Sequence, residues 1–291
     1  MKTVVLYGAG EFTKRFLCQP TNEYIVAAIV DRNWENIRSL MGHLVIAPSL
    51  IVNYDFDYVI ISLDDLKMGN DVHIFQIYDS LVKIGIPDEK ILLQSFKSQE
   101  YHINRYPRMV YVRELSELMR ERNIRGSVAE CGVYRGWFSA MINEFFSEES
   151  LYLFDTFSGF DTRDVESDLS PAIKAIKEGK FDHFNRTSEE IVKLRCPYRE
   201  RLIFKKGYVP DTFEGVRDCF CFVNLDMDLY VPQLAALRFF APRMVEGGVI
   251  LVHDYYNNIF PGTRKAVQEL AAEQSLILHP IGDGLSIALL F

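Results

Sequence analysis

The stretch S-V-A-E-C-G-V-Y-R-G, residues 127–136, decides the fold of this chain. An apolar strand pattern ends in Glu130, and Gly132 and Gly136 bracket a short turn before a helical pattern begins. A second apolar run then ends in Asp155. The glycines let the backbone turn sharply and let a ligand approach closely, and a carboxylate after the second strand can accept hydrogen bonds from ribose hydroxyls. This order predicts a nucleoside-binding α/β unit.

Strand and helix patterns alternate to the end of the chain, which predicts a mostly parallel sheet. The last two strand patterns are joined by Gly282-Asp283-Gly284, a hairpin signal. An α/β sheet closed by a terminal antiparallel hairpin is the layout of class I S-adenosylmethionine-dependent methyltransferases, whereas a dinucleotide-binding domain would continue its parallel windings. We expect strands at residues 127–131, 151–155, 201–205, 220–225, 248–253, 275–279 and 284–290, and helices at residues 136–146, 232–241 and 262–272.

A long connection, residues 161–198, separates two of these strands. Connections of this length usually have a role of their own. Two alternatives stay open for it: a lid over the acceptor, or a helical decoration that packs on the edge of the sheet.

The first hundred residues carry a separate α/β pattern and predict a smaller Rossmann-like domain, residues 1–96. A G-A-G turn follows the first strand, and Asp31 lies about 20 residues onward, as in a ribose-binding unit. Thr13 stands where the third glycine of a dinucleotide fingerprint would be, so a plain βα turn and a nucleotide site both stay open. We expect this domain to bind a nucleotide or sugar or to mediate oligomerisation, with strands at residues 2–7, 24–30, 58–62 and 90–93, a linker at 95–108 and a second domain at 108–291.

The composition of the chain argues against several classes of function. The net charge of −8 argues against a nucleic-acid partner, which favours a basic face. No apolar run approaches the roughly 20 residues that a membrane span needs. The five cysteines form no C-x-x-C pair and no zinc spacing, so we expect them to be reduced, in a cytoplasmic protein. The sequence is also compatible with a homo-oligomer.

Six motifs in the second domain occur in a fixed order. Together they resemble the macrocin O-methyltransferase family, whose members methylate sugar hydroxyls in antibiotic biosynthesis, over residues 108–291. The motifs are E-C-G-V-Y-R-G (130–136), L-Y-L-F-D-T-F-S-G-F (151–160), K-G-Y-V-P-D-T-F (206–213), N-L-D-M-D-L-Y (224–230), P-R-M-V-E-G-G-V-I-L-V-H-D-Y (242–255) and P-G-T-R-K-A-V (261–267).

The resemblance implies S-adenosylmethionine as cofactor and a sugar, nucleotide sugar or natural product as acceptor. It implies that Glu130, Gly132 and Gly136 line the methionine end of the cofactor. Asp155 would then bind the ribose, and Ser158 would lie near the adenosine. The first domain resembles the small Rossmann-like domains of sugar-modifying enzymes.

The resemblance also implies that Asp226 is a metal ligand and a general base. His253 and Asp254 stand where the family shows two consecutive acids, which leaves the metal open. Both groups end predicted parallel strands, and the carboxyl ends of such strands form the ligand crevice. Asp226 with Asp254 suits Mg²⁺, and the imidazole of His253 shifts the preference toward Mn²⁺.

Other roles stay open for the same residues. His253 could itself be the base, because its unperturbed pKa lies near neutrality. Asp228 could instead cap the helix that begins near Pro232. Two other functions are compatible with the sequence. One is a nicotinamide-dependent sugar oxidoreductase that uses the G-A-G turn, and the other is a nucleotide-binding protein without catalysis.

Overall fold

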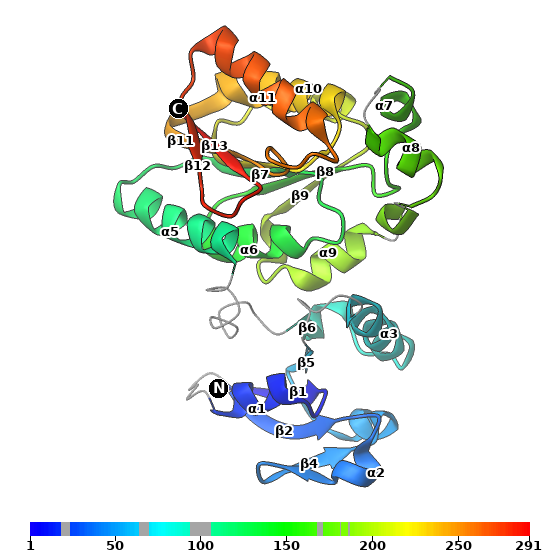
Figure 1. The fold of residues 1–291 in the computed structure, drawn as a ribbon. Coiled ribbons are helices and arrows are strands. Elements are labelled where there is room, and N and C mark those ends of the chain that lie inside the picture. Colours follow the sequence, from blue (N-terminus) through cyan, green and yellow to red (C-terminus); the bar gives the residue numbers. More distant parts are fainter. Residues whose placement is uncertain (19–23, 64–69, 94–105, 168–170, 181, 186) are drawn as a thin grey trace. The chain divides into compact units, whose positions relative to one another are not determined.

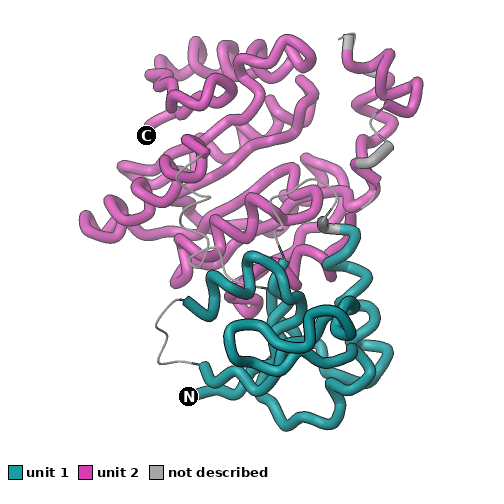
Figure 2. Tube along the Cα trace, turned by 60° about the horizontal axis from the view of Figure 1, so that its bottom comes forward, with its two compact units in different colours: residues 1–99 teal, residues 100–291 magenta. Residues whose placement is uncertain are grey.

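The computed structural model describes residues 1–18, 24–63, 70–93, 106–167, 171–180, 182–185 and 187–291 (Figure 1). The chain divides into two compact units, residues 1–99 and residues 100–291 (Figure 2). The expected linker, residues 95–108, falls mainly outside the described residues. Its last two residues belong instead to helix α5, Pro107–Glu121, which begins with a proline at a position where no backbone donor is needed.

The first unit is a six-stranded sheet in the order β3-β4-β2-β1-β5-β6. All described pairs are parallel except β3 with β4, which is antiparallel. The four expected strands are present, and the short β3 and β4 add to them. The strands are β1 (Lys2–Tyr7), β2 (Tyr24–Val30), β3 (Ser39–Leu40), β4 (His43–Ile46), β5 (Tyr58–Ile61) and β6 (Ile91–Leu93), and the helices are α1 (Glu11–Cys18), α2 (Trp34–Ile37) and α3 (Asn70–Lys83).

The second unit is a seven-stranded sheet in the order β12-β13-β11-β10-β7-β8-β9. Strand β13 runs antiparallel to both of its neighbours, and the other described pairs are parallel. The terminal hairpin therefore inserts its last strand beside β11, which confirms the expected methyltransferase layout. The strands are β7 (Ser127–Cys131), β8 (Leu151–Asp155), β9 (Leu202–Lys206), β10 (Phe220–Leu225), β11 (Met244–Val252), β12 (Leu278–Pro280) and β13 (Ile287–Leu290).

Helices cover both faces of this sheet. Helices α10 (Tyr230–Phe240) and α11 (Pro261–Gln274) pack over one face, where Phe154, Phe220 and Phe240 belong to the main hydrophobic core. Helices α5, α6 (Trp137–Phe145) and α9 (Glu189–Arg195) cover the other (Figure 1). Paired strands end together, since Leu225 pairs with both Cys131 and Val252. The residues that follow these strands therefore share one edge of the sheet.

The described residues of the long connection, 161–198, are mainly helical. It contains α7 (Thr162–Ser167), α8 (Pro171–Lys177) and α9. A small core joins it to the loops after β10 and β11, because Ile173 clusters with Leu229 and Phe260. The hydroxyl of Tyr208, after β9, also donates to the Asp164 carboxylate at 2.7 Å. These contacts fix the connection over the carboxyl edge of the sheet.

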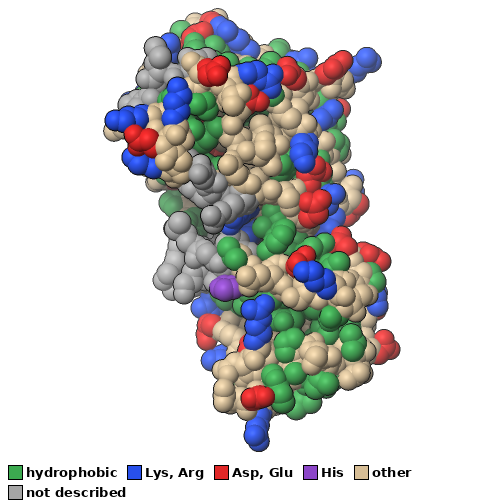
Figure 3. All heavy atoms as spheres, turned by 90° about the vertical axis from the view of Figure 1, so that its right-hand side faces the viewer, with side chains coloured by type: hydrophobic (Ala, Val, Ile, Leu, Met, Phe, Trp, Pro, Cys, Tyr) green, Lys and Arg blue, Asp and Glu red, His purple; other side chains and the backbone are tan. Residues whose placement is uncertain are grey.

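Among the helices that the structure describes, none combines the length and the apolar character that crossing a membrane requires. Figure 3 shows hydrophobic side chains at the surface of the first unit. The exposed ones there include Ile25, Leu44, Leu50 and Val52.

Candidate active site

A cavity of about 330 Å³ lies at the carboxyl edge of the second sheet. Its lining comes from the ends of five parallel strands. Gly132 follows β7, Asp155 ends β8, Tyr208 lies after β9, Asp226 follows β10 and His253 follows β11. The cavity therefore joins the predicted cofactor turn to the predicted catalytic residues.

The walls of this cavity are aromatic and acidic. Tyr134, Phe154 and Phe260 contribute rings, and the long connection contributes Phe184 together with Asp161 and Asp164. This contribution to the wall favours the first of the two alternatives for the connection, a lid over the acceptor. Flat apolar rings suit a purine base, and carboxylates suit a cation.

Asp155 holds the glycine turn closed. Its Oδ2 accepts hydrogen bonds from the backbone N–H of Val133 at 2.7 Å and of Tyr134 at 2.9 Å, and its Oδ1 accepts from Phe157 at 2.7 Å. Burial raises the pKa of Asp155, although these three amides oppose the rise. The carboxylate also lines the cavity, so one side chain both shapes the turn and faces the ligand space.

Gly132 is required where the turn meets β10. Its φ is +85°, and a Cβ there would lie 2.0 Å from the carbonyl oxygen of Asp226. Gly136, at the start of α6, has φ +72°, and a Cβ there would lie 2.7 Å from the Val192 side chain of α9. The first glycine brings the turn against the catalytic strand end, and the second makes room for the long connection.

The other predicted cofactor residues lie outside the cavity lining. Glu130 is buried beneath the sheet edge, where the hydroxyl of Ser139 and the Asn224 amide, at 3.1 Å, donate to its carboxyl oxygens. Burial raises the pKa of Glu130 to about 8. Gly136 supports the turn from behind, and Ser158 is exposed in the loop after β8. The structure brings Gly132 and Asp155 to the cavity and places the other three around it.

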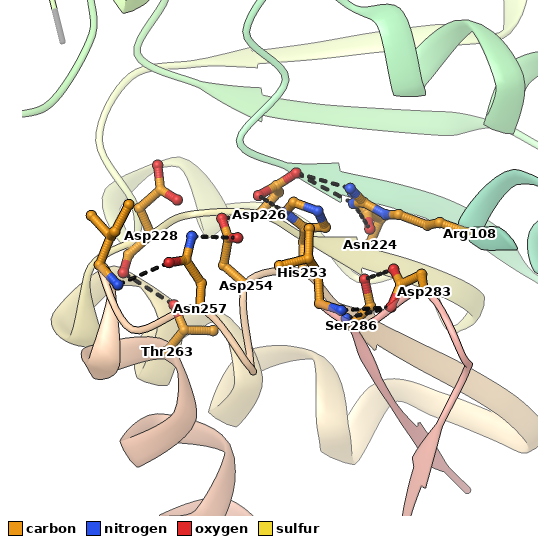
Figure 4. Close-up of polar contacts among 12 residues, drawn as sticks. Arg108, Asn224, Asp226, Asp228, His253, Asp254, Asn257, Thr263, Asp283 and Ser286 are labelled. Atoms are coloured by element: carbon orange, nitrogen blue, oxygen red, sulfur yellow. Dashed lines mark hydrogen bonds and ion pairs between the residues drawn. The ribbon is translucent and has the colours of Figure 1, made fainter. Parts of the chain in front are cut away.

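The catalytic candidates converge as expected (Figure 4). Nδ1 of His253 lies 3.1 Å from Oδ1 of Asp226 and 3.2 Å from Oδ2 of Asp254. The Asn257 amide donates to Oδ1 of Asp254 at 2.9 Å. The imidazole thus bridges two carboxylates from neighbouring strand ends.

The charged groups in this cluster shift each other's pKa values. Burial tends to raise the pKa of Asp226, but the positive charges of His253 and Arg108 outweigh it and lower that pKa to about 2. Burial tends to lower the pKa of His253, but the Asp226 charge and hydrogen bonds to both carboxylates raise it to about 9. At neutral pH an imidazolium therefore lies between two ionised aspartates.

Asp228 does not cap the helix, so that alternative is wrong. The residue at the start of α10 is Leu229, and no side chain caps the helix there. Asp228 adopts φ +63° and lines the cavity instead. Burial, together with the charges of Asp226 and Asp254, raises its pKa well above the usual range. The tight turn after β10 directs this carboxyl group to the site rather than to the helix.

Arg108 is the site residue that sequence reasoning missed. Its Nη1 and Nη2 each lie 3.3 Å from Oδ2 of Asp226, and Nη2 donates to Oδ1 of Asn224 at 2.7 Å. Its guanidinium carbon lies 3.9 Å from the ring centre of Phe138. The sequence carried one signal, a cation in the first turn of a helix, where the helix dipole disfavours it.

The donor atoms of Asp226, His253 and Asp254 lie within 4.8 Å of one another, close enough for a single ion to contact all three. The charges around these donor atoms favour a divalent ion less than the spacing of the atoms does. Asp226 already faces the permanent cation of Arg108, and an ion on the same carboxylate would be repelled by it. Nδ1 of His253 also lies within hydrogen-bond reach of both carboxylates, a position in which it donates rather than ligates. The metal thus remains a prediction.

The fold of this chain is similar to that of a solved O-methyltransferase structure. No curated protein matches the sequence. The structure of the O-methyltransferase NovP is 23% identical, with a TM-score of 0.54 over 63% of this chain and 79% of that chain. The structure of CalS11, a calicheamicin methyltransferase, is 18% identical, with a TM-score of 0.49 over 77% of this chain and 94% of that chain.

Two family models match separate parts of the chain. The model named C2185-like, N-terminal matches residues 1–92. The model for macrocin O-methyltransferase (TylF) matches residues 98–283, which is more than half of the chain. This protein therefore belongs to the macrocin O-methyltransferase family and is an S-adenosylmethionine-dependent O-methyltransferase.

Proposed function

We propose that this enzyme transfers the methyl group of S-adenosylmethionine to a hydroxyl of a sugar or of a glycosylated small molecule. The observation that carries the proposal is a single cavity that reaches from Gly132 and Asp155 to Asp226 and His253. Cofactor and acceptor can therefore meet within one cavity. Family membership favours this function over a nicotinamide-dependent oxidoreductase and over a non-catalytic binding protein.

The cofactor lies at the turn after β7 in this proposal. S-adenosylmethionine carries a positive sulfonium, and the aspartates that line the cavity favour a cation. Asp155 has lone pairs left for the ribose hydroxyls, and Gly132 lets the methionine end approach the backbone. Glu130 and Gly136 act indirectly, by supporting this turn, and Ser158 borders the adenosine end.

The chemistry requires alignment and removal of one proton. When bound, the cofactor supplies a methyl group that its positive sulfur already activates. A sugar hydroxyl has a pKa far above neutrality, but its proton becomes strongly acidic as the new oxygen–carbon bond forms. Asp226 is ionised at neutral pH because its pKa is lowered to about 2, so its carboxylate can accept the proton at that stage.

His253 orients the base in this mechanism. Its pKa of about 9 means that it already carries a proton at neutral pH, so Asp226 is the better acceptor. The imidazole N–H holds Oδ1 of Asp226, and Asn257 holds Asp254 on the other side. Positioned groups of this kind lower the barrier by restricting the reactants to a reactive geometry. No step depends on the predicted metal ion.

The long connection excludes water from the reaction. Phe160 and Phe184 form part of the wall, and Asp164 anchors the connection through Tyr208. Excluding water strengthens the electrostatic contacts inside the cavity. The covered cavity also limits the size of the acceptor.

The remaining assignments concern the setting of the enzyme. The five cysteines are free, which supports a reducing compartment such as the cytoplasm. The first unit supplies acceptor binding, subunit contacts or both, and its exposed apolar side chains support the second role. The net charge of −8 supports small molecules rather than nucleic acids as partners.

The test is methyl transfer with a labelled cofactor. Incubation with S-adenosyl-[methyl-¹³C]methionine and a panel of nucleotide sugars and glycosylated natural products should yield a labelled O-methyl sugar, detected by mass spectrometry and NMR. Transfer to a phenol or an amine, with no sugar in the panel accepting the label, would contradict the proposed acceptor class.

A further inference from the structure

Asp226 is contacted on both carboxylate oxygens by nitrogen cations from different elements. His253 lies at Oδ1, and the guanidinium of Arg108 lies 3.3 Å from Oδ2 through two nitrogens (Figure 4). His253 lines the cavity, whereas Arg108 does not. Arg108 therefore contacts Asp226 from outside the cavity lining.

The guanidinium is held firmly in this position. Its guanidinium carbon lies over the Phe138 ring, 3.9 Å from the ring centre, and only 14% of its side chain is exposed. Its Nη2 donates to Asn224, whose own amide nitrogen donates to buried Glu130. This chain fixes the orientation of the Asn224 amide and, through it, of Arg108.

The position of Arg108 in helix α5 is unfavourable for its charge and for its Nε group. Arg108 lies in the first turn of α5, where the helix dipole disfavours a cation, and its Nε is buried without a hydrogen-bond partner among the described residues. An arginine at this position is better explained by the partner that its side chain contacts than by the helix. That partner is the carboxylate at the centre of the proposed site.

An arginine cannot lose its proton in a protein, so this charge is permanent. A divalent ion at Asp226 would compensate the charge of this carboxylate. Arg108 already does so, and its two N–H groups on Oδ2 also orient the carboxylate.

We propose that Arg108 is the resident cation of this site, that it positions Asp226 for proton transfer, and that methyl transfer therefore needs no divalent ion. The inference rests on the proposed role of Asp226 as base. Arg108 is a positioning residue rather than a catalytic one.

The first test is Mn²⁺ binding, which requires no acceptor. Electron paramagnetic resonance of the full-length protein with S-adenosylhomocysteine bound should show no specific Mn²⁺ site at millimolar ion. The double variant Arg108→Ala with His253→Asp, which exposes three carboxylates, should gain a site. Specific Mn²⁺ binding to the wild type that disappears in Asp226→Asn would overturn the proposal. Since the wild type and Asp226→Asn together give this result, the test is valid even if the double variant fails to fold.

The second test is kinetic. Arg108→Ala should lower kcat about 100-fold, the scale of a misplaced reacting group, with little change in the acceptor KM or in the affinity for S-adenosylhomocysteine. Arg108→Lys, which keeps the charge, should recover part of the rate, and added guanidinium should partly rescue Arg108→Ala. Arg113→Ala, in the same helix where Arg113 pairs with Glu114, is the matched control and should match the wild type.

Two outcomes would contradict the proposal. One is an unchanged kcat in a folded Arg108→Ala. The other is loss of wild-type activity after exhaustive EDTA treatment with recovery on adding Mg²⁺ or Mn²⁺. Failure of methyl transfer with every acceptor would count against the proposed function instead, and the Mn²⁺ titration would still decide the role of Arg108.

Discussion

The two units of this chain build the same turn and use it differently. In the first unit, Oδ2 of Asp31 accepts a hydrogen bond from the N–H of Ala9, 22 residues earlier. In the second, Oδ2 of Asp155 accepts from Val133, also 22 residues earlier. In both, the acid after the second strand closes the turn after the first. An acid at this spacing is therefore part of the turn and does not by itself mark a ligand site.

The units differ at the neighbouring strand end. The N–H of Ser62, after β5, donates to the last residue of β1, and the N–H of Asp226, after β10, donates to the last residue of β7. A Cβ on Gly8 would meet the Ser62 carbonyl oxygen at 2.9 Å, and a Cβ on Gly132 would meet that of Asp226 at 2.0 Å. The first unit thus has a hydroxyl where the second has the proposed base. Strand ends, more than the glycine turn, distinguish the catalytic unit.

The largest effect should come from exchanging that acid. Asp226→Asn should lower kcat about 10³-fold, within the range for loss of a general base, and leave the affinity for S-adenosylhomocysteine nearly unchanged. Ser62→Ala, at the equivalent place, should leave kcat unchanged. Steady-state methyl transfer measures both. Comparable losses in the two variants would break the distinction between the units.

The next effect separates the two turn acids. Asp155→Ala should weaken binding of S-adenosylhomocysteine by about 1–3 kcal/mol, the range for a lost charged hydrogen bond. Asp31→Ala removes the same turn contact from the first unit and should leave this affinity intact. Isothermal titration calorimetry of both variants is the measurement. Unchanged binding by Asp155→Ala would remove Asp155 from the cofactor site.

A smaller effect concerns Glu130, which lies two residues before Gly132, where the first unit has Leu6 before Gly8. Its pKa is raised from 4.5 to about 8, so the folded state holds a proton that the unfolded state releases. The stability this provides is complete below pH 4.5 and is lost as pH rises through about 8. Between these two pH values, the free energy of unfolding of Glu130→Gln should therefore rise relative to that of the wild type by up to about 1.4 kcal/mol per pH unit. Urea unfolding at several pH values tests it, and a constant difference would contradict the assignment.

The smallest expected effect is that of removing the first unit. A chain that begins near residue 101 should bind S-adenosylhomocysteine with nearly the affinity of the full protein, because every residue that lines the cavity belongs to the second unit. Calorimetry on a folded, soluble truncation is the measurement. Loss of binding in such a protein would assign the first unit a part in the cofactor site.

Local patterns predicted most of the fold. Apolar runs and turn residues predicted all seven strands of the second sheet, and Gly282-Asp283-Gly284 predicted the antiparallel hairpin at its end. The bounds of the last two strands differ, since β12 is Leu278–Pro280 and β13 is Ile287–Leu290, against the expected residues 275–279 and 284–290. Strands β3 and β4 were missed because they are short, and Leu44 is exposed in one of them. Convergence of Asp226 with His253 was predictable, since parallel strands end at a common edge.

Long-range contacts account for what the sequence could not reveal. Arg108 and Asp226 are 118 residues apart, and no local pattern joins a helix start to that strand end. Glu130 was expected beside Gly132, but side chains alternate along a strand, and its side chain points beneath the sheet toward Ser139. A cap by Asp228 is compatible with the sequence because no local pattern predicts the positive φ, +63°, that directs its carboxyl group to the cavity.

The most direct test of the account is a crystal structure of the full chain with S-adenosylhomocysteine. We expect one molecule per chain, in the cavity of the second unit, with its ribose at Asp155 and its sulfur facing Asp226. A molecule bound instead at the G-A-G turn of the first unit, residues 8–10, would contradict the account.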